Sequence, residues 1–482
     1  MKLKNLLRDI PVLAATADME MEISGVSYDS RTTRPGDLFV AMTGFAVDGH
    51  AYMEAALAAG AAAVLCQQLP AGDAPVIQVE NSRRALALVG ANFFGHPAES
   101  MTLLGVTGTN GKTTTTYLLK AVLEQALGAK VGLIGTNQNM IGSEVLPTER
   151  TTPESFELQR LFAQMQDAGC THVVMETSSH ALVLDRVYGV HYAVGVFTNL
   201  TQDHLDFHHT MEAYCDAKAL LFQRCDLGVY NADDPWAERL LKKASCPTFS
   251  YACRTKADLV AENVVLSAEG ISFDAVTKDA RTKIKVGIPG GFMVYNTLDV
   301  LGAALALGIS LPQSAAALAR VPHVKGRVEV VPTPGKDYTI LVDFAHSPDG
   351  LQNVLSTVKG FAKGRTVAVF GCGGDRDKSK RPKMGKTAAE LADFVVITSD
   401  NPRTEQPRDI IADILPGLEG LTTPHIVVEN RVEAIHYAMD HAGAGDVIVL
   451  CGKGHETYQE INHVKHHLDE REVVAAYLAE KP

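Results

Sequence analysis

A glycine-rich segment, Gly108-Thr109-Asn110-Gly111-Lys112-Thr113, lies between an apolar run at residues 101–106 and a helical pattern that begins at Lys112. Glycine lets the backbone approach a phosphate group closely, and the amide groups at the start of a helix favour an anion. A second apolar run follows at residues 130–134. The pattern therefore predicts a strand–loop–helix–strand unit with a phosphate-binding loop, which places the chain in the α/β class.

The side chains of this loop suit a nucleotide triphosphate with a hard cation. Lys112 offers a positive charge to the β- and γ-phosphates, and Thr113 offers a hydroxyl to Mg²⁺. The strict phosphate-loop pattern requires glycine at position 106, where this chain has Val106, so the loop is a variant. A chance Gly-Lys-Thr in a surface turn is disfavoured by the strand before it and the helix after it. We expect ATP and Mg²⁺ as ligands.

The chain of 482 residues is too long for one hydrophobic core and divides into three segments by pattern. Residues 1–98 mix short strands with an alanine-rich helix. Residues 99–321 contain the phosphate loop and a patch of alternating runs at 258–289 that predicts antiparallel strands. Residues 322–482 alternate five apolar runs with helical patterns, which predicts a doubly wound parallel sheet of Rossmann type.

Composition excludes several classes of protein. The 44 Lys and Arg residues against 56 Asp and Glu residues leave a net charge of −12, so a dedicated nucleic-acid binder is disfavoured. The eight cysteines form no Cys-x-x-Cys pair, which predicts free thiols rather than a disulfide framework or zinc ribbon. The N-terminus lacks the apolar core of a signal peptide, and no apolar stretch is long enough to span a membrane. We expect a cytoplasmic protein with no membrane partner.

Polar clusters follow most of the expected strands. In open α/β sheets, ligands bind beyond the carboxyl ends of the strands, so these clusters predict two rims that face a substrate cleft. Carboxylate oxygens suit Mg²⁺ better than imidazole does, which makes Glu176 a stronger candidate ligand than His204. From the residues alone, the prediction is an ATP-dependent enzyme whose chemistry stays open. The clusters occupy residues 107–113, 176–180, 199–204, 343–346, 371–377, 400–403 and 452–456.

The same clusters, in this order, resemble the motifs of the Mur ligase family over essentially the whole chain. The resemblance rests on the variant loop at 108–113 and on segments 176–180, 199–206, 217–218, 326–329 and 343–346. It implies three domains: residues 1–98 for a UDP moiety, residues 99–321 for ATP, and residues 322–482 for an incoming amino acid. It also implies that Lys218 carries a carbamate that binds a second Mg²⁺, although an unremarkable surface lysine is what the residues alone suggest there.

The resemblance implies roles for individual residues of the nucleotide site. Catalytic roles fall to Lys112, Lys218, Arg327 and His204, and metal ligation to Thr113, Glu176, His204 and the Lys218 carbamate. The residues expected to bind ATP are Gly108, Thr109, Asn110, Gly111, Lys112, Thr113, Thr114, Asn296, Arg327, Asp343 and His346. Relatives often carry asparagine where this chain has Met293, so the contacts to adenine stay open.

Within the family, the chain most resembles the branch that adds the third residue to UDP-MurNAc-L-Ala-D-Glu. The segment Asp400-Asn401-Pro402-Arg403 is the form associated with meso-2,6-diaminopimelate, whose distal carboxylate a guanidinium can bind with two hydrogen bonds. The expected diaminopimelate site comprises Arg376, Asp400, Asn401, Pro402, Arg403, Gly452 and Glu456. The expected UDP-MurNAc-dipeptide site comprises Ser30, Thr151, Thr152, Ser178 and Arg186.

The implied activity is ATP-dependent amide formation through an acyl phosphate, in cytoplasmic synthesis of peptidoglycan precursors. Three alternatives stay open: a lysine-adding ligase, a related ligase such as folylpolyglutamate synthase, and a non-catalytic scaffold derived from the family. Arg403 disfavours the first, because it would face the amine end of lysine. The segments Asp400 to Arg403 and Asp29-Ser30-Arg31 disfavour the second. Intact Lys112, Glu176 and Lys218 disfavour the third. We expect only small-molecule partners and a monomer.

Overall fold

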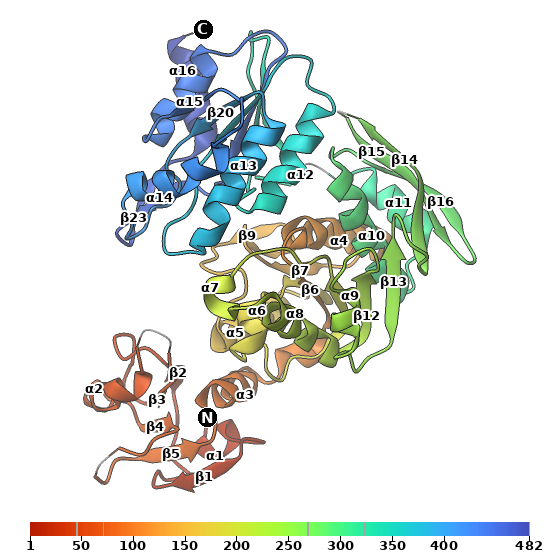
Figure 1. Ribbon diagram of the computed structural model, residues 1–482. Helices are drawn as coiled ribbons and strands as arrows, with labels where there is room; N and C mark the ends of the chain where they lie inside the picture. Colours follow the sequence, from red (N-terminus) through yellow and green to blue (C-terminus); the bar gives the residue numbers. More distant parts are fainter. Residues whose placement is uncertain (45–46, 71, 268, 322–323, 482) are drawn as a thin grey trace. The chain divides into compact units, whose positions relative to one another are not determined.

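The structure is a computed structural model that describes residues 1–44, 47–70, 72–267, 269–321 and 324–481 (Figure 1). The chain forms two compact units. The first comprises Met1–Gly105, Ala129–Val194 and Gln223–Asp226, and the second comprises Val106–Gly128, Gly195–Phe222 and the chain from Leu227 onward. The expected domain limits at residues 98 and 321 stay a prediction.

The first unit begins with a five-stranded sheet in the order β1-β5-β4-β3-β2. Strands β2 to β5 are parallel, and β1 pairs with β5 in the antiparallel sense. Buried leucines of α1 and α3, among them Leu6 and Leu86, pack on this sheet in one hydrophobic cluster. The elements are α1 (Leu3–Leu6), β1 (Val12–Ala15), β2 (Gly25–Ser27), β3 (Asp37–Val40), α2 (Met53–Ala58), β4 (Ala63–Cys66), β5 (Val76–Val79) and α3 (Ser82–Phe94).

The remainder of the first unit carries a second group of strands. Strand β10 is parallel to β7, and β7, β8 and β9 continue as an antiparallel run. Strands β6 (Thr102–Thr107) and β11 (Tyr192–Phe197) begin in this unit and end in the second one. The other elements are β7 (Val131–Ile134), β8 (Asn139–Ile141), β9 (Glu144–Leu146), α5 (Ser155–Asp167), β10 (His172–Glu176) and α6 (Ser179–Val183).

The second unit contains the helix of the phosphate loop and a strand group in the order β12-β13-β14-β15-β16. Strands β14, β15 and β16 are antiparallel, as predicted for residues 258–289. The elements are α4 (Lys112–Leu127), α7 (Leu205–His208), α8 (Met211–Ala219), β12 (Cys225–Asn231), α9 (Ala237–Leu241), β13 (Thr248–Ala252), β14 (Leu259–Ser267), β15 (Gly270–Thr277), β16 (Arg281–Val286), α10 (Gly291–Ala306) and α11 (Leu311–Leu318).

The C-terminal part of the second unit is a six-stranded sheet in the order β17-β18-β22-β19-β20-β21. All neighbouring pairs are parallel except β17 with β18. The strands are β17 (Glu329–Val331), β18 (Thr339–Asp343), β19 (Thr366–Phe370), β20 (Phe394–Ile397), β21 (His425–Val427) and β22 (Val447–Cys451).

Helices cover both faces of this sheet (Figure 1). Buried side chains of α12, α13 and α14, such as Leu351, Met384 and Ile410, form one hydrophobic cluster. Buried side chains of α15 and α16, such as Ile435 and Val474, form the other. The predicted doubly wound α/β architecture is therefore confirmed. The helices are α12 (Pro348–Lys359), α13 (Arg381–Leu391), α14 (Pro407–Ile414), α15 (Arg431–Asp440) and α16 (Glu470–Glu480), and a hairpin of β23 (Tyr458–Ile461) and β24 (Val464–His467) precedes α16.

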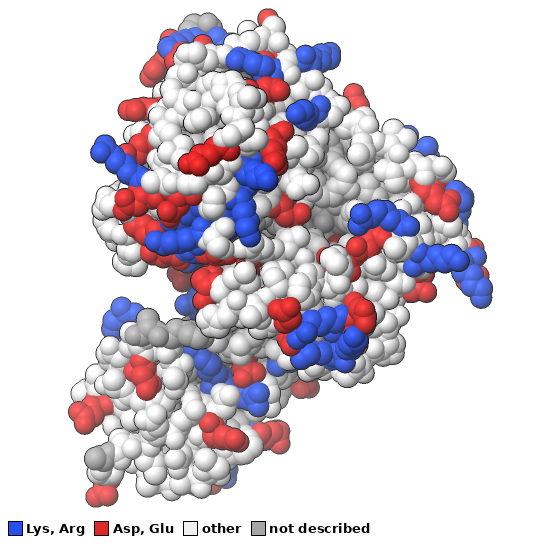
Figure 2. Space-filling view, in the orientation of Figure 1, with Lys and Arg blue, Asp and Glu red and all other residues white. Residues whose placement is uncertain are grey.

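Three expectations from composition can be compared with the described residues. All eight cysteines are free thiols, and six of them are buried, as predicted. Among the described helices, none is long and apolar enough to cross a membrane. On the face drawn in Figure 2, acidic and basic side chains are interspersed, so that face has no continuous basic surface.

Candidate active site

The phosphate loop adopts a backbone that only glycine tolerates at two positions. Gly108 has a φ of 153°, and a Cβ atom there would lie 1.8 Å from the Thr198 hydroxyl oxygen. Gly111 has a φ of 88°, and its Cβ would lie 2.4 Å from Oδ1 of Asn296. Any larger residue would collide at both positions, so the loop can curl tightly ahead of α4. The positive end of that helix consequently faces the loop, as an anion site requires.

Two lysine amines meet at one carbonyl of the loop. Nζ of Lys112 donates to the carbonyl oxygens of Gly108 and Thr109, each at 2.9 Å. Nζ of Lys218, from α8, donates to the Gly108 carbonyl at 2.8 Å and lies 4.5 Å from the centre of the Tyr214 ring. Lys218 is buried, which corrects the reading of a surface lysine that its residue type suggests. Burial, reinforced by the charge of Lys112, lowers the pKa of Lys218 well below its usual value.

The loop is also held by side chains from distant parts of the second unit. The Asn110 amide donates to Oδ1 of Asn199 at 3.0 Å, and the Thr198 hydroxyl donates to the Asn110 carbonyl at 2.6 Å. The Asn110 side chain donates to Oδ2 of Asp349, at the start of α12, at 2.6 Å. Asp349 was not among the residues expected from the sequence.

Arg327 adds a guanidinium to the nucleotide site. Its Nη2 donates to the hydroxyl of Thr113 at 3.0 Å, and its guanidinium lies 4.8 Å from the centre of the Phe344 ring. Asp343 lies at the end of β18 and accepts the amides of Val328 and Ala345, both at 2.8 Å. The structure thus brings together Thr113, Arg327 and Asp343, although Thr113 precedes the other two by more than 200 residues.

Three charged or titratable groups lie around Asp203. Its carboxylate lies 3.2 Å from Nζ of Lys380 and 3.6 Å from Nε2 of both His204 and His346. Burial alone would raise the pKa of Asp203, but the charge of Lys380 and the two imidazoles outweigh it and hold the pKa well below its usual range. His204 itself has a φ of 54°, in the left-handed region. The expected residues His204 and His346 therefore share one buried carboxylate.

A cavity of about 730 Å³ opens beside the loop, within the second unit. Asn110, Gly111, Thr114, Asn296, Arg327 and Asp343 line it, all expected ATP-binding residues. Tyr295 also lines it and donates its hydroxyl to Oδ2 of Asp233 at 3.0 Å. Asn296 is buried, with Nδ2 3.8 Å from Sδ of Met293. A volume of this size suits one nucleotide.

Several other residues that line this cavity were not expected from the sequence. Asn231 ends β12, and Asp233 and Asp234 follow it, so a search for polar residues at strand ends could have found them. Asp349 and Asn353 lie inside α12, and Tyr295 lies inside α10, where no local signal distinguishes them from other helix residues.

In the first unit, Glu176 ends β10 and is buried. Its Oε1 accepts the amide of Thr136 at 2.9 Å, and its Oε2 accepts the Thr136 hydroxyl at 3.0 Å. The Thr136 hydroxyl also lies 2.9 Å from that of Thr151. A Cβ on Gly135 would lie 2.5 Å from the Glu176 carboxylate, so the glycine gives this side chain its room. Two bonds fix the carboxylate in a single orientation.

The residues expected at the UDP-MurNAc-dipeptide site lie around Thr152. Its hydroxyl donates to the Glu176 carbonyl at 2.7 Å and accepts the amide of Ser178 at 3.0 Å. Nη1 of Arg186 donates to the Thr152 carbonyl at 3.2 Å, and Nε of Arg186 lies 3.2 Å from Glu154. The described contacts do not join Ser30, which follows β2, to this group.

Three arginines surround the single carboxylate of Glu154. It lies 3.2 Å from Arg186, 3.4 Å from Arg150 and 3.8 Å from Arg83. Burial, with the neighbouring arginines, lowers the pKa of Arg186 despite the Glu154 charge. Three cations against one anion leave a positive excess beside Thr152, which suits an anionic ligand.

The expected diaminopimelate residues lie at the carboxyl edge of the C-terminal sheet. Arg403 has a φ of 52°; its Nη1 donates to the Gly374 carbonyl at 2.7 Å and its Nε lies 3.2 Å from Glu460. Arg376 lies on the neighbouring loop after β19 and donates to the Asp375 carbonyl at 2.8 Å. Glu460, on β23, was not expected from the sequence. Two arginines thus converge on one rim, although one of them already has a carboxylate partner.

On the same rim, Glu456 contacts Lys453 and Asn401. Nζ of Lys453 lies 3.0 Å from Oε2 of Glu456 and donates to Oδ1 of Asn401 at 2.8 Å. Nδ2 of Asn401 donates to Oε2 of Glu456 at 2.9 Å. Gly452 has a φ of 113°, and a Cβ there would lie 2.4 Å from the carboxylate of Asp400. Asp400, Asn401, Gly452 and Glu456 are therefore brought together as expected, with Lys453 as a partner that the sequence analysis did not assign.

A phosphate loop beside a cavity of nucleotide size, together with a doubly wound sheet, defines an ATP-binding α/β protein. Three family models match the chain: "Mur ligase family, catalytic domain" at residues 22–94, "Mur ligase middle domain" at residues 106–304, and "Mur ligase, glutamate ligase domain" at residues 326–454. The chain belongs to the Mur ligase family.

Individual relatives match over nearly their full length. A protein of Clostridium botulinum, named UDP-N-acetylmuramoyl-L-alanyl-D-glutamate--2,6-diaminopimelate ligase, is 47% identical over 95% of this chain and 96% of its own. A protein of Clostridium acetobutylicum with the same name, numbered 1, is 45% identical over 100% of both chains. A solved structure of a ligase of that name is 32% identical, with a TM-score of 0.69 over 100% of this chain and 99% of its own.

Proposed function

We propose that this chain is an ATP-dependent ligase that joins meso-2,6-diaminopimelate to UDP-MurNAc-L-Ala-D-Glu in the synthesis of peptidoglycan precursors. The observation that carries the proposal is Arg403, held on the rim of the C-terminal sheet beside Arg376. The names of the relatives at 47% and 45% identity support the same reaction. Lysine lacks the distal carboxylate that this pair of cations suits, so a lysine-adding ligase is the weaker candidate.

The chemistry follows from the weakness of a carboxylate as an electrophile. The D-Glu carboxylate first takes the γ-phosphoryl group of ATP and becomes an acyl phosphate. The amine of diaminopimelate then attacks the acyl carbon, the amide forms, and inorganic phosphate leaves. Lys112 and Arg327 carry the positive charges that stabilise the transferring phosphoryl group. No protein nucleophile is required for these steps.

The residues expected to hold Mg²⁺ fit a hard cation. Glu176 is a buried carboxylate fixed by two hydrogen bonds, and Thr113 offers a hydroxyl at the start of α4. The ion, when bound, neutralises phosphate charge. His204 is the less suitable donor by chemistry, and its imidazole lies beside Asp203. Among the described residues, no group of three or more His, Cys, Asp or Glu side chains that could hold a metal ion is found.

The carbamate proposed on Lys218 has a physical rationale here. Carbamate forms when a neutral amine attacks CO₂, and the lowered pKa of Lys218 favours the neutral amine. A protonated Lys218 would be repelled by the charge of Lys112, whose amine donates to the same Gly108 carbonyl. Replacing the Lys218 ammonium with an anionic carbamate turns that repulsion into attraction.

The dipeptide end of the UDP substrate would bind in the first unit. Thr151, Thr152, Ser178 and Arg186 form a connected group, and the positive excess around Glu154 suits the substrate's carboxylates. Ser30 would contribute at the uridine end. In this proposal the anionic dipeptide binds beside the arginines of the first unit, and ATP binds at the phosphate loop.

The reaction is tested by phosphate release from ATP with UDP-MurNAc-L-Ala-D-Glu present. We expect release to depend on meso-diaminopimelate, with a much lower kcat/KM for L-lysine. A preference for lysine would refute the substrate assignment. Absence of amino-acid-dependent release with any candidate amino acid would instead favour a non-catalytic member of the family.

We further propose that the chain acts as a monomer in the cytoplasm, where its nucleotide substrates are made. Light scattering on the purified chain would test the first part, and a dimer at micromolar concentration would contradict it. Fractionation of the source cells would test the second.

A further inference from the structure

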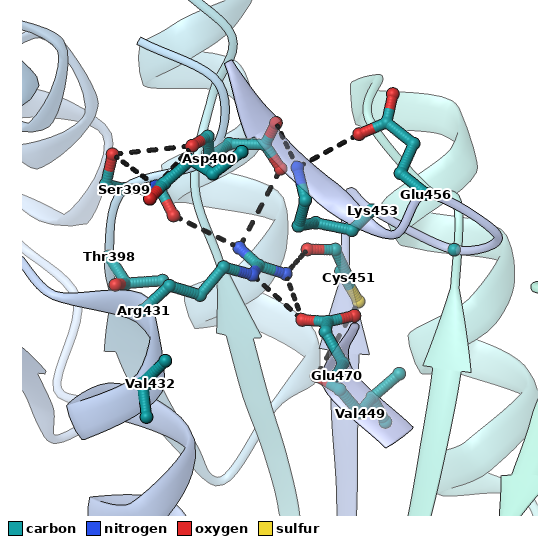
Figure 3. A network of polar contacts seen from close by, with 12 residues as sticks. Thr398, Ser399, Asp400, Arg431, Val432, Val449, Cys451, Lys453, Glu456 and Glu470 are labelled. Carbon is teal, nitrogen blue, oxygen red and sulfur yellow. Dashed lines mark hydrogen bonds and ion pairs between the residues drawn. The ribbon is translucent and has the colours of Figure 1, made fainter. Parts of the chain in front are cut away.

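Arg431, the first residue of α15, is buried and donates to three groups (Figure 3). Nε donates to Oε1 of Glu470 at 2.8 Å, and Nη2 donates to the Cys451 carbonyl at 2.8 Å. Nη1 donates to the Ser399 carbonyl at 3.4 Å. A planar guanidinium offers five N–H donors in a rigid fork, enough to reach all three acceptors.

The two carbonyls belong to the roots of two different loops. Ser399 directly precedes the segment 400–403, which follows β20, and Cys451 directly precedes the segment 452–456, which follows β22. Strand β19 lies between β20 and β22 in the sheet, so no ladder of hydrogen bonds joins these strand ends directly. One side chain therefore ties together the two loops that carry most of the proposed diaminopimelate site.

Arg431 is also the cation that lies closest to the Asp400 carboxylate in the network drawn in Figure 3. Its Nη1 lies 3.7 Å from Oδ2 of Asp400, against 4.0 Å from Nζ of Lys453 to Oδ1. Within the described residues, the buried Oδ2 has no hydrogen-bond partner. Burying a carboxylate is costly unless a cation lies close by.

The charges of the network do not balance. Arg431 and Lys453 are positive, while Asp400, Glu456 and Glu470 are negative, which leaves one negative charge in excess. Glu470 pairs with Arg431 at 2.7 Å and is buried. The excess therefore lies with the buried Asp400 and the partly exposed Glu456. An ammonium group of the incoming amino acid would balance it.

We propose that Arg431 is a positioning residue for the amino-acid site: it sets the spacing of segments 400–403 and 452–456 and holds Asp400 toward the substrate ammonium. This inference rests on the proposed function of that site. Arg431 touches no substrate itself. It acts through Asp400 and through the carbonyls of Ser399 and Cys451, which directly precede the two loops. Its loss changes the affinity for the amino acid and leaves the nucleotide site intact, since the ATP cavity is lined by none of these residues.

The test compares KM values for all three substrates in Arg431→Met/Glu470→Met and Arg431→Lys. The double variant removes both charges of the Arg431–Glu470 pair together, so neither member of that pair is left unpaired, and Asp400 keeps Lys453 at 4.0 Å. Arg431→Lys keeps the charge but cannot reach Glu470 and both carbonyls. Arg365→Met is the matched control, because Arg365 pairs with Asp446 at 2.7 Å at the opposite edge of the same sheet.

We expect the double variant to raise KM for meso-diaminopimelate about tenfold or more, which corresponds to about 1.4 kcal/mol, and Arg431→Lys to raise it less. KM for ATP and for the UDP-dipeptide should stay within about twofold, and all three should be unchanged in Arg365→Met. An unchanged KM for diaminopimelate in both variants, or an equal rise in all three KM values, would overturn the inference. If the wild-type chain uses lysine instead, the proposed substrate fails, while the same comparison made with lysine still decides the role of Arg431.

Discussion

Arg403→Lys tests the central claim about substrate choice. The substitution keeps the positive charge and the Cβ geometry, so the left-handed backbone at φ 52° is no more strained than before. What it removes is the planar fork. In the structure, Nη1 and Nε of Arg403 already bind the Gly374 carbonyl and Glu460, and the side chain is only 18% exposed.

The size of the effect follows from the donors that are lost. A lysine amine that keeps its contact with Glu460 has no second, coplanar donor for the distal carboxylate. Losing one hydrogen bond to a charged group costs about 1.5–3 kcal/mol, or roughly a 10- to 150-fold change in affinity. We therefore expect KM for meso-diaminopimelate to rise by about that factor, with kcat little changed.

The assay is phosphate release at saturating ATP and UDP-MurNAc-L-Ala-D-Glu, with meso-diaminopimelate varied. L-Lysine, which has no distal carboxylate, should lose little kcat/KM, so the preference between the two amino acids should shrink. Arg365→Lys serves as the control, since Arg365 binds Asp446 with a similar fork far from the rim. A KM for diaminopimelate within twofold of the wild-type value would refute the assignment of Arg403 as the reader of the carboxylate.

Three further predictions address the nucleotide site and the core. Gly111→Ala should raise KM for ATP at least about tenfold, because the new Cβ would lie 2.4 Å from Oδ1 of Asn296 at a φ of 88°; calorimetric titration with a non-hydrolysable ATP analogue checks this, and wild-type affinity would contradict it. Lys218→Arg should abolish activity and also abolish a carbamate carbon signal in NMR spectra recorded with ¹³C-bicarbonate, whereas a signal that survives the substitution would place the carbamate elsewhere. Burial raises the pKa of Asp299 to about 8. Between about pH 4 and pH 8, Asp299 is therefore deprotonated in the unfolded chain and still protonated in the folded chain. The free energy of unfolding falls by up to about 1.4 kcal/mol per pH unit as the pH rises through that window. Asp299→Asn has no such titration, so the melting temperature of the variant relative to that of the wild type should rise from pH 5.5 to pH 8. Melting temperatures that change in parallel over this range would disprove a buried proton on Asp299.

Local pattern was sufficient for much of the fold. The parallel strands β19, β20 and β22 are short apolar runs bounded by polar clusters, and the antiparallel strands β14 to β16 alternate in a way that helices do not. The phosphate loop was visible because its glycines are required by backbone geometry rather than by contacts with distant residues. These features depend on neighbours in the sequence, which is why the sequence alone predicts them.

The residues that were missed depend on partners far away in the chain. Asp349 contacts Asn110 across 239 positions, and Glu460 meets Arg403 across 57. Each is an acidic residue in a helix or a hairpin, with nothing in its own surroundings to separate it from a solvated one. Arg431 is a sharper case, because an arginine at the start of a helix is usually exposed, whereas here it is fully buried between two loop roots.

Lys218 shows why a residue's role can escape both its type and its spacing. On its own helix it follows Asp216 and Ala217, a setting that suits an exposed lysine. Its amine contacts the Gly108 carbonyl and the Tyr214 ring, and burial, reinforced by the charge of Lys112, an amine 106 positions earlier, lowers its pKa. Two amines at one carbonyl, one of them the buried Lys218, are unfavourable as a pair of cations. The proposed carbamate resolves that conflict by reversing one charge, and the conflict exists only once the fold has brought the two lysines together.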